Sequence, residues 1–159
     1  MGPALLSDIK TEAKALLGEI IQIRRHLHSN PELSFQEEKT AQFISELLTK
    51  WQIPHQSGIA GHGIVATIQG KSDQIVALRA DMDALPILEK NEVDYISKFP
   101  GIMHACGHDV HMACLLGATH ILNNIKEQLP TSLRIVFQPG EEKLPGGASL
   151  MIGEGVLQN

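Results

Sequence analysis

The spacing of apolar side chains predicts two amphipathic helices in the first third of the chain. Apolar residues recur every three or four positions over residues 5–28, with charged residues between them, which is the period of one helix face. Pro31 disfavours helix in the residue before it, so this helix should end before the segment SNPELS at 29–34. A second helix is predicted at about 35–50 from apolar positions at Ala41, Ile44, Leu47, Leu48 and Trp51.

The pattern changes to short β-rich runs after residue 60. GIVATIQG at 63–70 and QIVALRA at 74–80 are joined by a short polar turn and predict a hairpin or two neighbouring strands. LRIVFQ at 133–138 predicts a buried strand. Two further helices are predicted, the second of them short: about 109–126, with Asp109 as its N-cap, and about 147–153.

The order of these elements predicts an α/β fold with a mixed sheet flanked by helices. A long loop rich in polar and turn residues separates the second strand from the third helix, and ordered loops of this kind are usually functional. The stretch MHACGHD enters a helix, and QPGEE follows a strand. Binding sites in open α/β sheets gather at the carboxyl ends of strands, so we expect these two stretches to meet in one cleft.

Composition narrows the class of protein. The chain has 159 residues, enough for one domain with a core. Its net charge of −5, without a basic block, argues against nucleic-acid binding, and no apolar run is long enough to cross a membrane. The N-terminus carries no signal-peptide pattern, and Cys106 and Cys114 form no disulfide framework. We therefore expect a cytoplasmic protein in a reducing compartment.

The stretch MHACGHDVH at 103–111 concentrates side chains that bind metals. Cys106 and His108 are two positions apart, and in extended backbone that spacing points both side chains the same way. A thiolate and an imidazole suit zinc or a similar ion. Two ligands do not hold an ion, and the best further donors are Glu141 and Glu142, directly after a strand. One of them can bind the metal while the other takes a proton from a water molecule.

Other interpretations of the same residues stay open. Cys106 is also compatible with a small buried apolar residue, or with a thiol nucleophile whose base is His108. The two glutamates are also compatible with a solvated loop. Asp81 and Asp83 in RADMDALP either cap a turn or orient a ligand histidine. The other histidines and the second cysteine near these motifs and in the helices receive no ligand role: His26, His28, His104, His111, Cys114 and His120.

Five segments, in this order, resemble one protein family. They are RRHLHSNPELSFQEEKT, GIVATIQG, ALRADMDALPI, MHACGHDVHMACLLGA and IVFQPGEEKLPGGASLMI. They resemble the metal-dependent N-acyl-amino-acid amidohydrolases, which include hippurate hydrolase and the plant auxin-conjugate hydrolases, within the aminoacylase and carboxypeptidase-G2-like metallopeptidase superfamily. The resemblance implies a zinc-peptidase-like catalytic domain that hydrolyses small N-acyl amino acids with one or two divalent ions, manganese or zinc.

The resemblance also implies roles for individual residues. Cys106, His108 and Glu142 match the metal ligands of the family, and Glu141 matches its catalytic general base. Asp83 matches an aspartate that orients the site.

Two positions depart from the pattern of the family and its superfamily. Asp81 stands where superfamily relatives have a histidine ligand, which makes a site with a thiolate ligand fit better. Gly140 replaces the usual alanine, a small-for-small exchange that is expected to change little.

The largest departure from the family is length, since family members are more than twice as long. Residues 1–159 correspond to the N-terminal part of the catalytic domain, without its C-terminal part, the satellite domain that helps dimerisation, or two further histidine ligands. The activity of the isolated chain is therefore not assured, and the full-length protein is expected to be a homodimer or larger. Two alternatives remain: a thiol-dependent hydrolase that uses Cys106, and a non-catalytic metal-binding module.

Overall fold

Two long helices open the chain, as the apolar spacing predicts. The computed structural model describes residues 3–158, and in it α1 spans Pro3–Ser29 and α2 spans Glu38–Lys50. The predicted start of the second helix at residue 35 is wrong by three residues. Phe35 has a φ of 64°, in the left-handed region, so the backbone turns there before α2 begins.

The sheet has four strands in the order β1-β2-β4-β3. β2 is antiparallel to both β1 and β4, whereas β3 is parallel to β4, so the predicted mixed α/β architecture is confirmed. The strand β1 was not predicted, because its sequence HQSGI is largely polar and exposed. The strands have these bounds: β1 His55–Ile59, β2 Gly63–Ile68, β3 Ile75–Asp81 and β4 Ser132–Gln138.

The prediction that β2 and β3 pair with each other is wrong, because β4 lies between them. β4 carries the most continuously buried apolar sequence of the four strands, with six of its seven residues buried, and a central position covers both of its edges. Ser132, the first residue of β4, is bonded to the turn that connects β2 and β3. Its hydroxyl accepts a hydrogen bond from the amide of Gly70 at 3.1 Å and donates one to the carbonyl of Ser72 at 3.0 Å.

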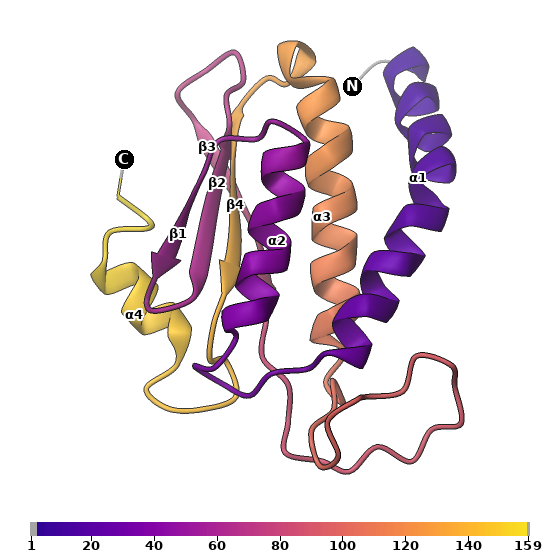
Figure 1. The fold of residues 1–159 in the computed structure, drawn as a ribbon. Coiled ribbons are helices and arrows are strands. Elements are labelled where there is room, and N and C mark those ends of the chain that lie inside the picture. Colours follow the sequence, from indigo (N-terminus) through magenta and orange to yellow (C-terminus); the bar gives the residue numbers. More distant parts are fainter. Residues whose placement is uncertain (1–2, 159) are drawn as a thin grey trace.

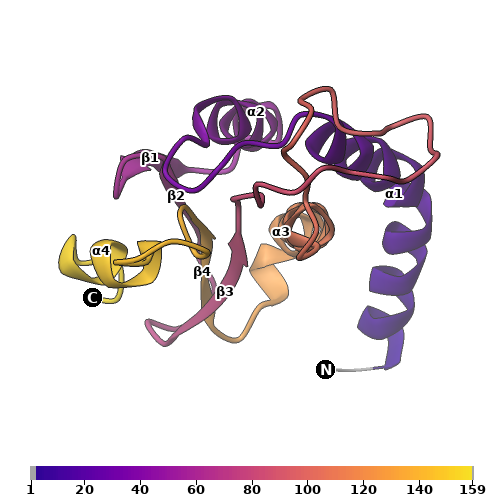
Figure 2. The same ribbon diagram turned by 90° about the horizontal axis from the view of Figure 1, so that it is seen from below.

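Helices cover both faces of the sheet (Figure 1). α2 and α3 (His108–Asn124) lie on one face, and α1 packs against the outer side of α3. The short helix α4 (Gly147–Gly153) lies on the opposite face, which is clearest from below (Figure 2). A single 3-10 turn at Lys126–Gln128 follows α3. The main core fills the space between the sheet, α2 and α3, and includes Ile44, Leu48, Met112, Leu116, Ile135 and Phe137.

The parallel pair β3 and β4 places two loops at one edge of the sheet. Asp81 at the end of β3 lies opposite Gln138 at the end of β4, and the amide of Met82 extends the pairing by donating to the carbonyl of Gln138 at 2.9 Å. The long loop at 82–107 and the loop at 139–146 therefore leave the sheet together, at the lower end in Figure 1. Among the described residues, no helix is both long and apolar enough to cross a membrane.

We expect Ile135→Ala to lower the free energy of unfolding by about 2–5 kcal/mol, because it opens a cavity in the central strand. Ile135 is fully buried, opposite Ala66 of β2 and Leu78 of β3. Urea denaturation measures the change. The control Val76→Thr keeps β-branching at a position that is 48% exposed, and should change stability by less than about 0.5 kcal/mol. Equal losses in both variants would contradict the central place of β4.

Candidate functional site

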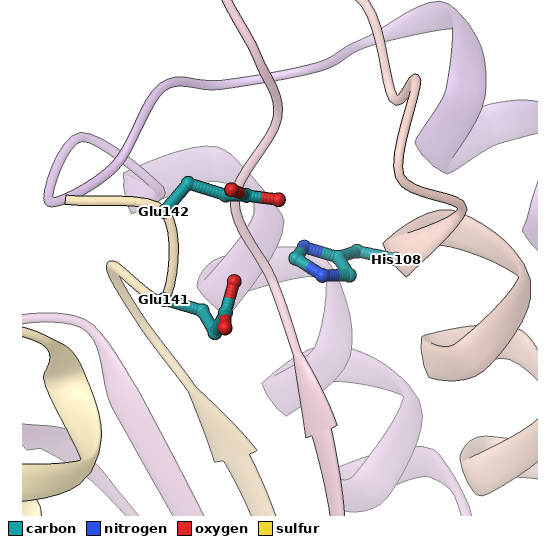
Figure 3. Close-up of side chains that lie close together, drawn as sticks. All are labelled: His108, Glu141 and Glu142. Atoms are coloured by element: carbon teal, nitrogen blue, oxygen red, sulfur yellow. The ribbon is translucent and has the colours of Figure 1, made fainter.

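Three of the side chains singled out in the sequence converge at the open end of β3 and β4. Potential ligand atoms of His108, Glu141 and Glu142 lie within 4.8 Å of one another. His108 is the first residue of α3, and the two glutamates belong to the loop after β4. Both carboxylates point toward the imidazole ring (Figure 3). The imidazole is buried and the glutamates are exposed, so the cluster opens to solvent on the carboxylate side.

Asp83 is the buried carboxylate behind this cluster. Its Oδ2 accepts hydrogen bonds from the hydroxyl of Ser34 at 2.6 Å and from the amide of Glu142 at 2.9 Å. Its Oδ1 lies 3.4 Å from Nδ1 of His108. Burial alone would raise the pKa of Asp83, but hydrogen bonds from His108, Ser34 and the amides of Glu142 and Glu141 lower it to about 2. Asp83 therefore stays ionised and joins three chain segments around the site.

The orientation of His108 is fixed by the same residue. Its Nδ1 lies 2.9 Å from the backbone carbonyl of Asp83, and since a carbonyl only accepts, Nδ1 carries the hydrogen. In the neutral ring the lone pair is then on Nε2, the nitrogen left free for a ligand bond. The hydrogen bond with the Asp83 carboxylate raises the pKa of His108 to about 9, so without a cation the ring holds a second proton.

The loop that carries the two glutamates is anchored at Gly140. The amide of Gly140 donates to the buried carboxylate of Glu37 at 2.7 Å, and its carbonyl accepts from Gly147 at 3.0 Å. Burial raises the pKa of Glu37 above its ordinary value. Gly140 has a φ of 57°, and a Cβ there would overlap the ring of Phe35. Alanine could therefore replace Gly140 in this chain only if the Phe35 ring moved.

Cys106 lies beside the cluster but outside its close core. Its side chain is exposed, and hydrogen bonding to the Glu142 carboxylate raises the pKa of the thiol to about 11. A protonated thiol is a poor nucleophile, which argues against the thiol-dependent alternative. The assumption of extended backbone between Cys106 and His108 is also wrong. Gly107 has a φ of 85°, and the chain turns into α3 at that point.

Asp109 does not cap α3, contrary to the prediction. The N-cap is Gly107, and Asp109 lies in the first turn with its side chain fully buried. Its Oδ2 contacts Nδ1 of His28 at 2.7 Å and Nε of Arg24 at 2.9 Å. His28 does lie in the last turn of its helix, as predicted, but it is buried in an ion-pair network rather than free at a helix end.

The remaining candidates lie in simpler surroundings. Asp81 pairs with Arg79 at 3.2 Å, and burial raises its pKa. Cys114 is exposed on α3. His104 is buried with neither ring nitrogen hydrogen-bonded, and burial lowers its pKa to about 4. Sequence reasoning missed Ser34 and Glu37. The segment SNPELSFQEE was a visible signal, but nothing in it shows that these two side chains reach loops 49 and 103 residues away.

The donor set fits a divalent cation. A neutral imidazole, two carboxylates and an adjacent thiol are the groups that bind zinc or manganese. Asp83 Oδ1 is buried, and its nearest cationic group is Nδ1 of His108 at 3.4 Å. Without a cation, the protonated His108 ring is the positive neighbour of this oxygen. A cation at the cluster would take the place of the second proton of His108 and would favour the thiolate of Cys106.

Comparisons with known proteins give the family of the chain. The model of peptidase family M20/M25/M40 matches residues 77–159, slightly more than half of the chain and the part that holds the cluster. The chain belongs to this family. The match to the M20/M25/M40 family confirms the resemblance inferred from the motifs.

Relatives in the M20/M25/M40 family are much longer than this chain. An N-acyl-L-amino acid amidohydrolase of Geobacillus stearothermophilus is 46% identical over 153 residues, covering 93% of this chain and 41% of the relative. The N-acetyl-L-cysteine deacetylase of Bacillus subtilis is 46% identical over 151 residues, covering 94% and 35%. The crystal structure of the Bacillus subtilis YXEP protein, a dinuclear metal-binding peptidase, matches with a TM-score of 0.86 and 41% identity, over 91% of this chain and 41% of that one. The chain therefore spans about two fifths of their length.

We expect Gly140→Ala to destabilise the protein by about 1–3 kcal/mol, from the left-handed backbone and the overlap with Phe35. Phe35→Ala removes the overlap but not the backbone cost. The double variant should therefore be about 1 kcal/mol more stable than the sum of the single losses predicts. A double-mutant cycle by urea denaturation measures this coupling. Strict additivity would show that the Phe35 ring does not hinder a side chain at position 140.

The metal-free protein should lose stability as the pH rises from about 6.5 to about 9. The pKa of His108 is raised from 6.5 to about 9 in the folded state, so the contribution is complete below 6.5 and lost above 9. The lowered pKa of Asp83 acts oppositely, and its contribution disappears as the pH falls from about 4 toward 2. Urea midpoints in chelator at several pH values test this. Asp83→Asn should flatten the alkaline slope, and an unchanged slope would contradict the pairing.

Proposed function

We propose that the protein is a metal-dependent hydrolase that cleaves the amide bond of N-acyl amino acids. The observation that carries the proposal is the convergence of His108, Glu141 and Glu142 within 4.8 Å at the end of a parallel strand pair. Relatives named amidohydrolase and deacetylase support amide hydrolysis as the reaction class. Residues 1–159 would form the N-terminal part of the catalytic domain, with a satellite domain elsewhere in the full-length protein.

We assign His108, Glu142 and Cys106 to hold the ion. Nε2 of His108 is free because Nδ1 is bound to the carbonyl of Asp83. Glu142 is the carboxylate beside the Cys106 thiol, which supports these two as ligands of one ion. When bound, the ion polarises the amide carbonyl and makes water a better nucleophile. Manganese or zinc suits this donor set, as one ion or two, and a relative that binds a dinuclear metal supports the latter.

Glu141 is left as the general base. Its carboxylate is exposed and points into the same space as the ligand side chains (Figure 3). It takes one proton from the water that attacks the amide carbonyl, and it passes that proton to the nitrogen as the carbon–nitrogen bond breaks. The products are a carboxylic acid and an amino acid. Asp83 holds His108 and the amide of Glu142 in place during these steps.

The exposed glutamates and the exposed thiol suit a small, soluble substrate that reaches the site from solvent. Free cysteines are typical of a reducing compartment, which supports a cytoplasmic location. For the full-length protein we propose a homodimer or larger assembly, by resemblance to the family.

We expect Glu141→Gln in the full-length protein to lower kcat by about 10²–10⁴-fold, because it removes the base. Its metal content should stay at the wild-type level, since Gln leaves the ligands in place. Hydrolysis of N-acetyl and N-benzoyl amino acids, with metal analysis of the same samples, measures both quantities.

Glu142→Gln is the matched control, and it should lose metal and activity together. Turnover of Glu141→Gln near wild type would remove Glu141 from the mechanism. Treatment with a chelator and with a thiol-alkylating reagent distinguishes the metal-dependent hydrolase from a thiol-dependent one. Activity that survives the chelator but not alkylation would favour a thiol-dependent hydrolase.

A further inference from the structure

His28 links two segments that are far apart in the sequence. It lies in the last turn of α1 and is 2% exposed. Its Nδ1 is 2.7 Å from Oδ2 of Asp109, and its Nε2 is 2.9 Å from Oε1 of Glu89. Each ring nitrogen of His28 thus faces one buried carboxylate oxygen. One side chain therefore connects the end of α1, the start of α3 and the long loop at 82–107.

The contact with Glu89 organises the long loop. The second oxygen of Glu89 accepts from the amide of Ser97 at 2.7 Å, and Oε1 also accepts from Asn91 at 3.0 Å. The amide of Lys98 donates to the carbonyl of Ser29 at 3.0 Å, next to His28. The middle of the loop is thus fastened to the last turn of α1, although it contains no helix or strand. The same loop carries Cys106 near its end.

The contact with Asp109 organises the start of α3. Asp109 directly follows His108 and is fully buried, with Arg24 as its second partner at 2.9 Å. Gly107, the N-cap of α3, has no side chain that could cap the helix. The contact of Asp109 with His28 holds this first turn against the last turn of α1. A shift of this turn moves the imidazole of His108.

We propose that His28 is a positioning residue that sets the metal affinity of the site by fixing the start of α3 and the loop that carries Cys106. It touches none of the proposed ligands and acts through Asp109 and Glu89. The inference deepens the proposed function and rests on it for the metal. The two contacts are independent of the metal and can be measured without it.

Two substitutions separate the contact of His28 with Asp109 (the Asp109 arm) from its contact with Glu89 (the Glu89 arm). His28→Asn keeps a donor near the position of Nδ1, toward Asp109, and His28→Gln keeps one near Nε2, toward Glu89. Amide hydrogen-exchange rates of the metal-free protein measure the loss of each contact separately. His28→Asn should speed exchange of the Ser97 amide, which is bonded to Glu89. His28→Gln should speed exchange of the Val110 and His111 amides, which close the first turn of α3 on the carbonyl of Gly107.

Metal affinity is the second readout. Calorimetric titration with zinc and with manganese should show about a tenfold or greater loss for His28→Ala, in line with outer contacts of other metal sites. The matched control is Ile125→Ala, a buried position just beyond the far end of α3. It should lower the free energy of unfolding comparably but change metal affinity less than twofold.

Wild-type metal affinity in His28→Ala, or a loss equal to that of Ile125→Ala, would overturn the positioning role. Failure of the wild-type protein to bind either metal would overturn the proposed function instead. In that case the exchange patterns of His28→Asn and His28→Gln still decide the inference. Faster exchange confined to the expected arm supports it, and unchanged exchange in both arms rejects it.

Discussion

The site depends on one buried carboxylate. Asp83 accepts from the Ser34 hydroxyl and the Glu142 amide and faces the His108 ring, so segments before α2, after β4 and at the start of α3 share one partner. A buried charge is costly unless donors surround it, and each donor here belongs to a different segment. The segments therefore cannot separate without leaving that charge unpaired. This constraint holds the loop that carries the two exposed glutamates against His108.

Charge around the site is arranged in two layers. Close to the cluster, Glu141 and Glu142 are exposed and face a single imidazole. Behind it, Asp109 and Glu89 are buried and contact Arg24 and His28. The two exposed carboxylates of the inner layer attract a cation, whereas the carboxylates of the outer layer are bound to protein side chains and hold the backbone. The acidic residues of the two layers therefore have different roles.

The sequence predicted the helices and most of the cluster, because these depend on local patterns. α1, α3 and α4 follow helical spacing, and His108, Glu141 and Glu142 stand at strand or helix ends. Strand order was not predictable in the same way, since the insertion of β4 between β2 and β3 depends on contacts over more than 60 residues. Ser34 and Glu37, and the contacts of His28, were missed for that reason. Their partners lie in distant loops, and no periodicity marks such contacts.

The central place of β4 also determines the order in which the chain can fold during synthesis. β4 is the last strand in the sequence but lies between β2 and β3 in the sheet. When residues up to 131 have left the ribosome, β1 and β2 can form a local hairpin, but β3 has no strand to pair with. The two halves of the sheet join only when residues 132–138 arrive, a non-local step that is slow by nature. During that interval β3 keeps a free edge of backbone hydrogen-bonding groups, and the incomplete sheet is the stage most prone to aggregation.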